Sequence, residues 1–97
     1  MRLHFTPHAV RDLTELADYI RAENPAAAGR ARDAIYQILR NLLLFPKVGR
    51  QQMTQGVRRV VVRKYPYLIY YTLGEADDEI IILNIKHSSR ERPHGDL

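Results

Sequence analysis

Two stretches in the first half of the chain carry apolar residues at intervals of three and four. The first follows Thr6-Pro7 and has its apolar positions at Val10, Leu13, Leu16, Ala17 and Ile20. The second follows Asn24-Pro25, stops before Pro46, and has them at Ala27, Ala28, Ala31, Ile35, Ile38, Leu39 and Leu42. This spacing places each set on one face of a helix, and a capping residue followed by proline is typical of a helix start. The pattern predicts two helices in an antiparallel hairpin, with a core that includes Leu13, Ile20, Ile35 and Leu42.

Alternating and continuous apolar runs predict four strands. Leu3 and Phe5 alternate with Arg2 and His4, which is the two-residue period of a short strand. Three later runs, at residues 57–64, 67–73 and 80–85, are rich in Val, Ile and Tyr and are separated by turn residues. Residues 80–83 are apolar on both faces, as in a central strand that is covered on both sides. The stretch from residue 46 to residue 56 is predicted to be a loop.

The predicted order of elements is β-α-α-β-β-β, and it indicates an α+β fold. We expect an antiparallel sheet with the helical hairpin packed on one face. The 97 residues form one domain, 1–97, because neither half of so short a chain could build a core of its own. The tail, residues 88–97, has no periodicity, and we expect part of it to be mobile.

The composition is typical of a folded cytoplasmic protein. Hydrophobic residues make up 45% of the chain and cysteine is absent, so the sequence suits a reducing compartment. The first residues lack the apolar segment of a secretory signal. The longest apolar runs, at residues 42–45 and 80–83, are far shorter than a membrane span. We therefore expect a cytoplasmic protein that contacts no membrane.

Positive charge is concentrated in one part of the chain. The net charge is +4, yet residues 1–45 are nearly balanced, with six basic and five acidic side chains. Residues 47–64 contain no acid and six bases, which are Lys47, Arg50, Arg58, Arg59, Arg63 and Lys64. Such a cluster attracts phosphate or an acidic protein, whereas Lys and Arg on a strand edge also serve to discourage unwanted pairing. Because cations without counter-ions repel each other, the pattern favours partner binding.

A series of short stretches carries a resemblance to a known family. They are Leu3-His4-Phe5-Thr6-Pro7 with Ala9, Asp12-Leu13, Asn24-Pro25-Ala26-Ala27-Ala28, Leu42 through Phe45-Pro46, Gly49-Arg50, Val57-Arg58-Arg59, Tyr67-Leu68-Ile69-Tyr70-Tyr71, and Ile82-Leu83-Asn84-Ile85-Lys86-His87 with Arg90. In order and spacing these stretches resemble the RelE/ParE toxin superfamily, whose fold has the same order of elements. The likeness covers nearly the whole chain.

The resemblance implies a growth-inhibiting toxin of a type II toxin–antitoxin system, of the kind associated with plasmid stabilization. Such a toxin forms a hetero-oligomer with a cognate antitoxin, whose extended segment wraps around it and neutralises it. ParE-like members inhibit DNA gyrase by protein contact, whereas RelE-like members cut messenger RNA on the ribosome. The two branches therefore predict a binding protein and an endoribonuclease, respectively.

An RNA-cleaving site without a metal needs a base, an acid and cations around the phosphate. If the chain is a nuclease, we expect that set to come from Arg58, Arg63, Lys64, His87 and Arg90. His87 is the candidate acid because its unperturbed pKa lies near ~6.5, although it could equally cap a strand end or contact the antitoxin. No base stands out, since Glu75, Asp77, Asp78 and Glu79 fall in a turn. RelE-like nucleases also carry a C-terminal tyrosine, which is lacking after Arg90, so the pattern favours the ParE-like branch and a protein without catalytic activity.

Other chemistries have weaker support. The histidine pairs His4 with His8 and His87 with His94 lack further ligands at useful spacing, so no metal or other cofactor is predicted. Strand tyrosines beside arginines could stack nucleic-acid bases, but such tyrosines more often pack on a sheet. A non-toxic basic module that binds nucleic acid thus stays a third hypothesis. For any partner, we expect the contacts to be made by Arg50, Arg58, Arg59, Arg63, Lys64, His87 and Arg90.

Overall fold

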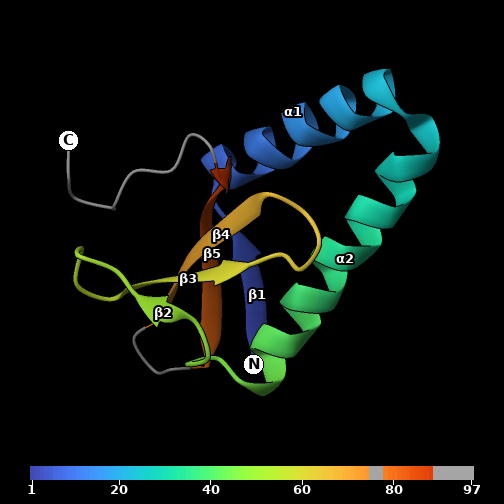
Figure 1. Cartoon of the computed structure of the whole chain (residues 1–97). Helices are drawn as coiled ribbons and strands as arrows, with labels where there is room; N and C mark the ends of the chain where they lie inside the picture. Colours follow the sequence, from blue (N-terminus) through green and yellow to red (C-terminus); the bar gives the residue numbers. More distant parts are fainter. Residues whose placement is uncertain (75–77, 89–97) are drawn as a thin grey trace.

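The computed structural model describes residues 1–74 and 78–88. Its elements are β1 (Arg2–Phe5), α1 (Pro7–Glu23), α2 (Pro25–Leu44), β2 (Arg50–Gln51), β3 (Val57–Val61), β4 (Tyr67–Leu73) and β5 (Glu79–His87), as Figure 1 shows. Apart from Ser88, the predicted mobile tail and Arg90 lie outside the described residues. In the part of the chain that is described, no helix has the length and apolar character needed to cross a membrane.

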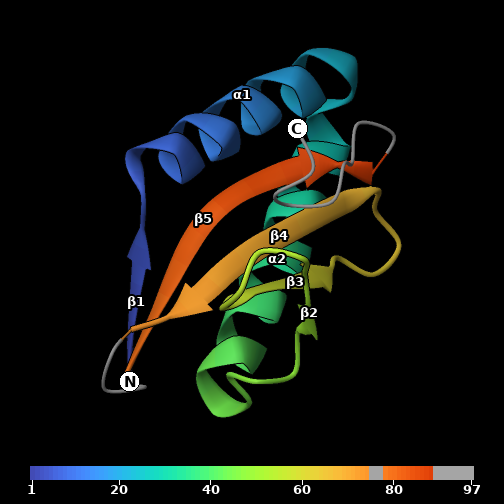
Figure 2. The same cartoon turned by 90° about the vertical axis from the view of Figure 1, so that its left-hand side faces the viewer.

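Both helices begin at the predicted signals. The Thr6 side-chain oxygen accepts a hydrogen bond from the Ala9 backbone nitrogen at 3.0 Å, directly before Pro7. The Asn24 side chain accepts from the nitrogens of Ala26 and Ala27 at 3.1 and 3.2 Å. These oxygens satisfy N–H groups that have no partner inside the first turn of a helix. Figures 1 and 2 show that α1 and α2 diverge from their junction, so the hairpin is open, with α1 beside β5 and α2 behind β3 and β4.

The sheet has five strands in the order β1-β5-β4-β3-β2. The predicted α+β class is confirmed, with two differences. First, β1 pairs with β5 in parallel, from Arg2 opposite Glu79 to Phe5 opposite Ile82, so the sheet is mixed, not wholly antiparallel. Second, the predicted loop contains the short strand β2, which pairs with β3. The strand direction differs because the two helices form a crossover that returns the chain to the sheet, and strand alternation alone does not encode that path.

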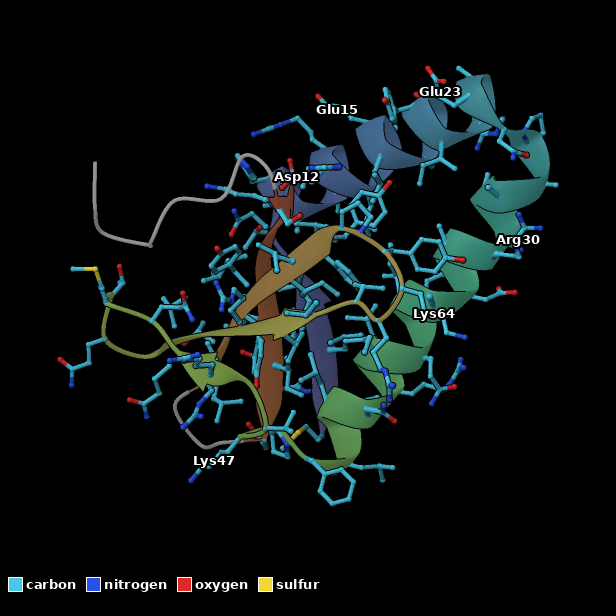
Figure 3. All side chains as sticks on the ribbon, viewed as in Figure 1. Asp12, Glu15, Glu23, Arg30, Lys47 and Lys64 are labelled. Carbon is cyan, nitrogen blue, oxygen red and sulfur yellow. The ribbon has the colours of Figure 1, made fainter. Side chains whose placement is uncertain are left out.

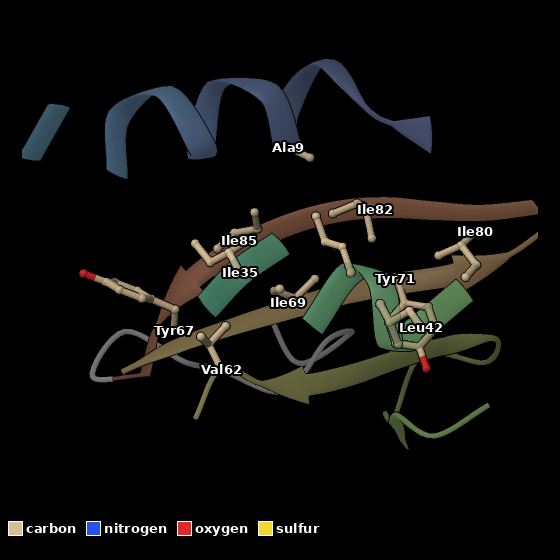
Figure 4. Close-up of a cluster of buried hydrophobic side chains, with 11 residues drawn as sticks. Ala9, Ile35, Leu42, Val62, Tyr67, Ile69, Tyr71, Ile80, Ile82 and Ile85 are labelled. Carbon is tan, nitrogen blue, oxygen red and sulfur yellow. The ribbon is translucent and has the colours of Figure 1, made fainter. Parts of the chain in front are cut away.

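The helices and the sheet enclose one main core. Figure 4 shows Ala9 of α1 and Ile35 and Leu42 of α2 facing the strands. The strand side chains on this face are Val62, Tyr67, Ile69, Tyr71, Ile80, Ile82 and Ile85. Of the predicted core residues, Ile35 and Leu42 are buried, and Leu13 and Ile20 are partly buried against them. The central position of β5 explains why residues 80–83 are apolar on both faces.

A register shift between β4 and β5 changes the other face of the sheet. Tyr70 pairs with Asn84 but Tyr71 pairs with Ile82, so Leu83 is an extra residue on β5. Leu83 then packs with Val57, Leu68 and Tyr70 in a small cluster away from the helices. We call this side of the sheet, which faces away from the helices, the open face.

Candidate partner-binding surfaces

The predicted cations do not form one surface, because neighbouring strand residues point to opposite faces. Arg58 pairs with Tyr71, whose side chain lies in the main core, whereas Arg59 pairs with Tyr70 on the open face. Arg63 and Lys64 are exposed in the turn between β3 and β4. Lys64 there has a positive φ of 69°, and Figure 3 shows it well apart from Lys47. Arg58 and Arg59, both predicted to contact a partner, therefore do not share one face of the sheet.

Arg58 holds the loop that follows α2. Its Nη1 donates to the backbone oxygens of Lys47 and Gly49 at 2.9 and 2.8 Å. The Tyr71 hydroxyl accepts from the Gly49 nitrogen at 2.9 Å and donates to the Pro46 oxygen at 2.7 Å. We call this set of four hydrogen bonds the Arg58–Tyr71 clamp. Burial raises the pKa of Tyr71, although the Gly49 N–H and the Arg58 charge act in the opposite direction, so the hydroxyl stays protonated and can donate.

Gly49 fits this clamp because it has no side chain. A Cβ atom at this position would lie 2.5 Å from the Tyr71 hydroxyl oxygen, well inside van der Waals contact. The sequence predicted a loop at residues 46–56, which includes Gly49, but not this requirement. The missing signal was the register of β3 and β4, which brings Tyr71 and Arg58 side by side beneath the loop.

The open face carries a polar row across four strands. Antiparallel partners share a face, and Arg50, Arg59, Tyr70 and Asn84 are successive partners from β2 to β5. Lys86 adds a third cation, with its Nζ 5.9 Å from the centre of the Tyr70 ring. Tyr70 itself is fully buried. Burial raises the pKa of Tyr70, and the Arg59 charge offsets part of this increase. The cations of this row can attract a polyanion.

His87 lies at the end of β5, beside a hollow of about 780 Å³. The centre of its ring lies 5.8 Å from the centre of the Tyr67 ring in an edge-to-face arrangement, and Tyr67 belongs to the main core. The hollow lies between α1 and the ends of β4 and β5 and is lined by His8, Asp12, Glu15, Leu16, Tyr19, Tyr67, Ile85, Lys86 and His87. Burial, then the neighbouring hydroxyls of Tyr19 and Tyr65, raise the pKa of Tyr67.

Asp12 fastens α1 to β5 in this hollow. Its Oδ2 accepts a hydrogen bond from the Ile85 nitrogen at 2.9 Å and lies 3.4 Å from His8 Nε2. Asp12 is not among the site residues predicted from the sequence, and helical spacing alone did not indicate this contact. The pairing of β1 with β5 ends at Phe5 opposite Ile82. Beyond that point the backbone of β5 is bound by side chains: the Thr6 hydroxyl donates to the Leu83 oxygen at 2.8 Å, and Asp12 accepts from Ile85.

His4 and His8 each lie close to a carboxylate, whereas His94 lies outside the described residues. His4 Nε2 lies 2.8 Å from a carboxylate oxygen of Glu79. His8 Nε2 lies 3.4 Å from Asp12 Oδ2. Within residues 1–74 and 78–88, no group of three or more His, Cys, Asp or Glu side chains has a geometry that could hold a metal ion.

Comparison with known proteins agrees with this architecture. The family model for the "ParE toxin of type II toxin-antitoxin system, parDE" matches residues 3–92. A protein of Sinorhizobium fredii named "Putative toxin Y4kP" is 29% identical over 92 residues, which are 95% of this chain and 93% of that protein. "Toxin RelE3" of Caulobacter vibrioides is 32% identical over 88 residues, covering 89% of this chain and 92% of the relative.

Solved structures give the same result. A chain of the chromosomal ParDE system from P. aeruginosa matches with a TM-score of 0.77 and 26% identity, over 90% of this chain and 95% of that one. A chain of the E. coli RelBE toxin–antitoxin complex matches with a TM-score of 0.65 and 14% identity, over 93% of this chain and 96% of that one, and it supports the fold alone. The chain belongs to the ParE toxin family of type II toxin–antitoxin systems.

Proposed function

We propose that this ParE-family toxin acts in the cytoplasm by binding and inhibiting DNA gyrase without catalysis, and that a cognate antitoxin neutralises it. Membership in the ParE family supports the choice of target. The separation of the candidate acid His87 from Arg50 and Arg59 supports a binding mode of action.

The single observation that carries the proposal is the separation of His87 from Arg50 and Arg59. His87 pairs with Tyr67 of the main core, whereas Arg59 pairs with Tyr70 of the open face. A general acid must reach the same phosphate that the cations hold. Lys86 lines the same hollow as His87, but His87 and Arg59 extend from opposite faces of the sheet, so these two do not surround one reacting group.

The tyrosines do not supply the missing base. Tyr67, Tyr70 and Tyr71 are buried, and burial raises the pKa of each above its ordinary value of 10.0. Efficient base catalysis needs a pKa near the working pH. The three hydroxyls are therefore poor bases in the cell.

A RelE-like nuclease is a second candidate, which one observation favours. The open face places Arg50, Arg59 and Lys86 around a sheet surface, where they could hold an RNA backbone. Such a surface accounts for RNA binding but leaves the acid and the base unassigned. The third hypothesis, a non-toxic nucleic-acid module, does not account for membership in a toxin family.

Induction of the protein in growing cells tests the proposal. We expect growth arrest, relaxation of a reporter plasmid, and relief of both by co-expression of the antitoxin. Primer extension on abundant transcripts should show no new codon-linked ends. Growth arrest with normally supercoiled plasmid and new transcript ends would overturn gyrase inhibition in favour of the nuclease.

A further inference from the structure

Three apolar side chains are exposed next to one another at the end of α2. Leu44 is 71% exposed, Phe45 65% and Val48 62%. Together with Pro46 and Lys47 they line an open hollow of about 450 Å³. Single exposed apolar residues are ordinary on a protein surface, but adjacent ones that share a hollow are typical of an interaction site. We call Leu44, Phe45 and Val48 the α2-end patch.

The loop that carries Val48 of this patch is held in place by hydrogen bonds. Val48 lies in the segment whose backbone is bound by the Arg58–Tyr71 clamp at Pro46, Lys47 and Gly49. The Phe45 oxygen also accepts from the Val48 nitrogen at 3.1 Å. Since a partner pays less ordering entropy when a surface is already fixed, the clamp prepares the patch for binding. It also explains why the charge of Arg58 is directed inward.

The surroundings of the patch are positive. No acidic residue occurs between Asp33 and Glu75. Lys47 and Arg50 are exposed in the adjoining loop and strand, and Figure 3 shows Lys47 near the end of α2. Arg40 is also exposed and precedes Leu44 by one helical turn, so the two lie on the same side of α2. An apolar patch with this rim complements a partner that carries carboxylates beside its apolar residues.

We propose that the α2-end patch is a docking site for an acidic amphipathic segment of a partner protein. The apolar face of the segment covers Leu44, Phe45 and Val48, and its carboxylates pair with Arg40, Lys47 and Arg50. A second copy of the chain is a poor occupant, because it would bring the same cations against this rim. The inference goes beyond the proposed function, since it does not depend on gyrase being the target.

The test uses two synthetic helical peptides of about 18 residues, or five turns. Both have the same leucine face, but one has glutamates and the other lysines at the remaining positions. Each is titrated into the purified full-length protein, labelled with nitrogen-15, and followed by amide shifts. The glutamate peptide should shift the amides of residues 43–49 and bind at least about tenfold more tightly than the lysine peptide.

Variants locate the binding surface. The double substitution Phe45→Ser with Val48→Ser should weaken the glutamate peptide by about tenfold or more, while the melting temperature stays close to that of the unmodified protein because both side chains are exposed. Val61→Ser removes another exposed apolar side chain, 54% exposed on β3, and should leave binding unchanged. This control distinguishes binding at the patch from non-specific binding to any exposed apolar side chain.

Three results would overturn the inference. They are equal binding of the two peptides, amide shifts centred on the open face, and undiminished binding by the double variant. A dimer that forms with rising concentration and is abolished by the double variant would assign the patch to a second copy instead. These readouts involve no gyrase, so they can fail while the proposed function stands.

Discussion

The Tyr71 hydroxyl and the Gly49 backbone nitrogen lie 2.9 Å apart, and this hydrogen bond joins the centre of the sheet to the loop after α2. Tyr71 is fully buried, so the loop is anchored to the most rigid part of the molecule. The α2-end patch and the short strand β2 both adjoin this anchor. The Arg58–Tyr71 clamp thus connects the stability of the core with the shape of a surface.

Gly49→Ala should destabilise the protein by about 1–3 kcal/mol, because its Cβ would enter the space of the Tyr71 hydroxyl. Thermal unfolding measures the change. Gly29→Ala is the matched control, since a Cβ there comes no closer than 4.0 Å to Arg32 Nη2 within α2. This control should stabilise the protein by about 0.5–1 kcal/mol. Similar effects at both glycines would contradict the close contact.

Arg58→Ala should lower the free energy of unfolding by about 1–3 kcal/mol, because the partly buried Gly49 oxygen and the exposed Lys47 oxygen lose their donor. Arg50→Ala, at an exposed position of the neighbouring strand, should change it by less than about 0.5 kcal/mol. Urea unfolding of both variants makes the comparison. If Arg58→Ala were as stable as Arg50→Ala, the clamp would have no structural role and Arg58 would return to the partner-binding set.

Asp12→Ala should cost about 1–3 kcal/mol, since it removes the acceptor of the Ile85 N–H. Asp18→Ala is the control on the same helix. Its side chain is 66% exposed and pairs with Arg21 on the surface, so its loss should cost at most about 1 kcal/mol. Hydrogen exchange at the Ile85 amide provides a second readout, which should accelerate in Asp12→Ala alone.

Stability should fall as the pH rises above 10. Burial raises the pKa values of Tyr67, Tyr70 and Tyr71 above the ordinary value of 10.0. Between the unfolded and folded pKa values the native state therefore binds more protons than the unfolded chain, and the free energy of unfolding decreases with pH. The contribution is fully present below pH 10. Urea midpoints measured from pH 8 to pH 12 check this, and a midpoint that stays constant over this range would contradict it.

Local signals predicted the helices and the core well. Thr6-Pro7 and Asn24-Pro25 locate both helix starts because capping is a contact over two or three residues. The continuous apolar run at residues 80–83 indicated a central strand because this pattern, too, lies within a few consecutive residues. Pairing is different, since the direction of β1 beside β5 depends on the path of the two helices and three strands that separate them in the sequence.

The candidate site was harder to predict, for reasons that the two arginines illustrate. Alternation implies that Arg58 and Arg59 face opposite ways once the strand is established. Their different roles depend on β4, which places Tyr71 beneath Arg58 and Tyr70 beside Arg59. Charge counted along the sequence could not separate an arginine that anchors a loop from one on the open face. Arg90 lies outside the described residues, and its role in partner binding stays a prediction.

The central claim is inhibition of gyrase by contact, and a supercoiling assay with purified components tests it most directly. The reaction contains gyrase, relaxed plasmid and ATP, but no ribosome or RNA, and the toxin is titrated against a fixed amount of gyrase. The account predicts that supercoiling stops once toxin is in modest molar excess over gyrase and resumes when the antitoxin is added. Full supercoiling at a large excess of folded toxin would contradict it.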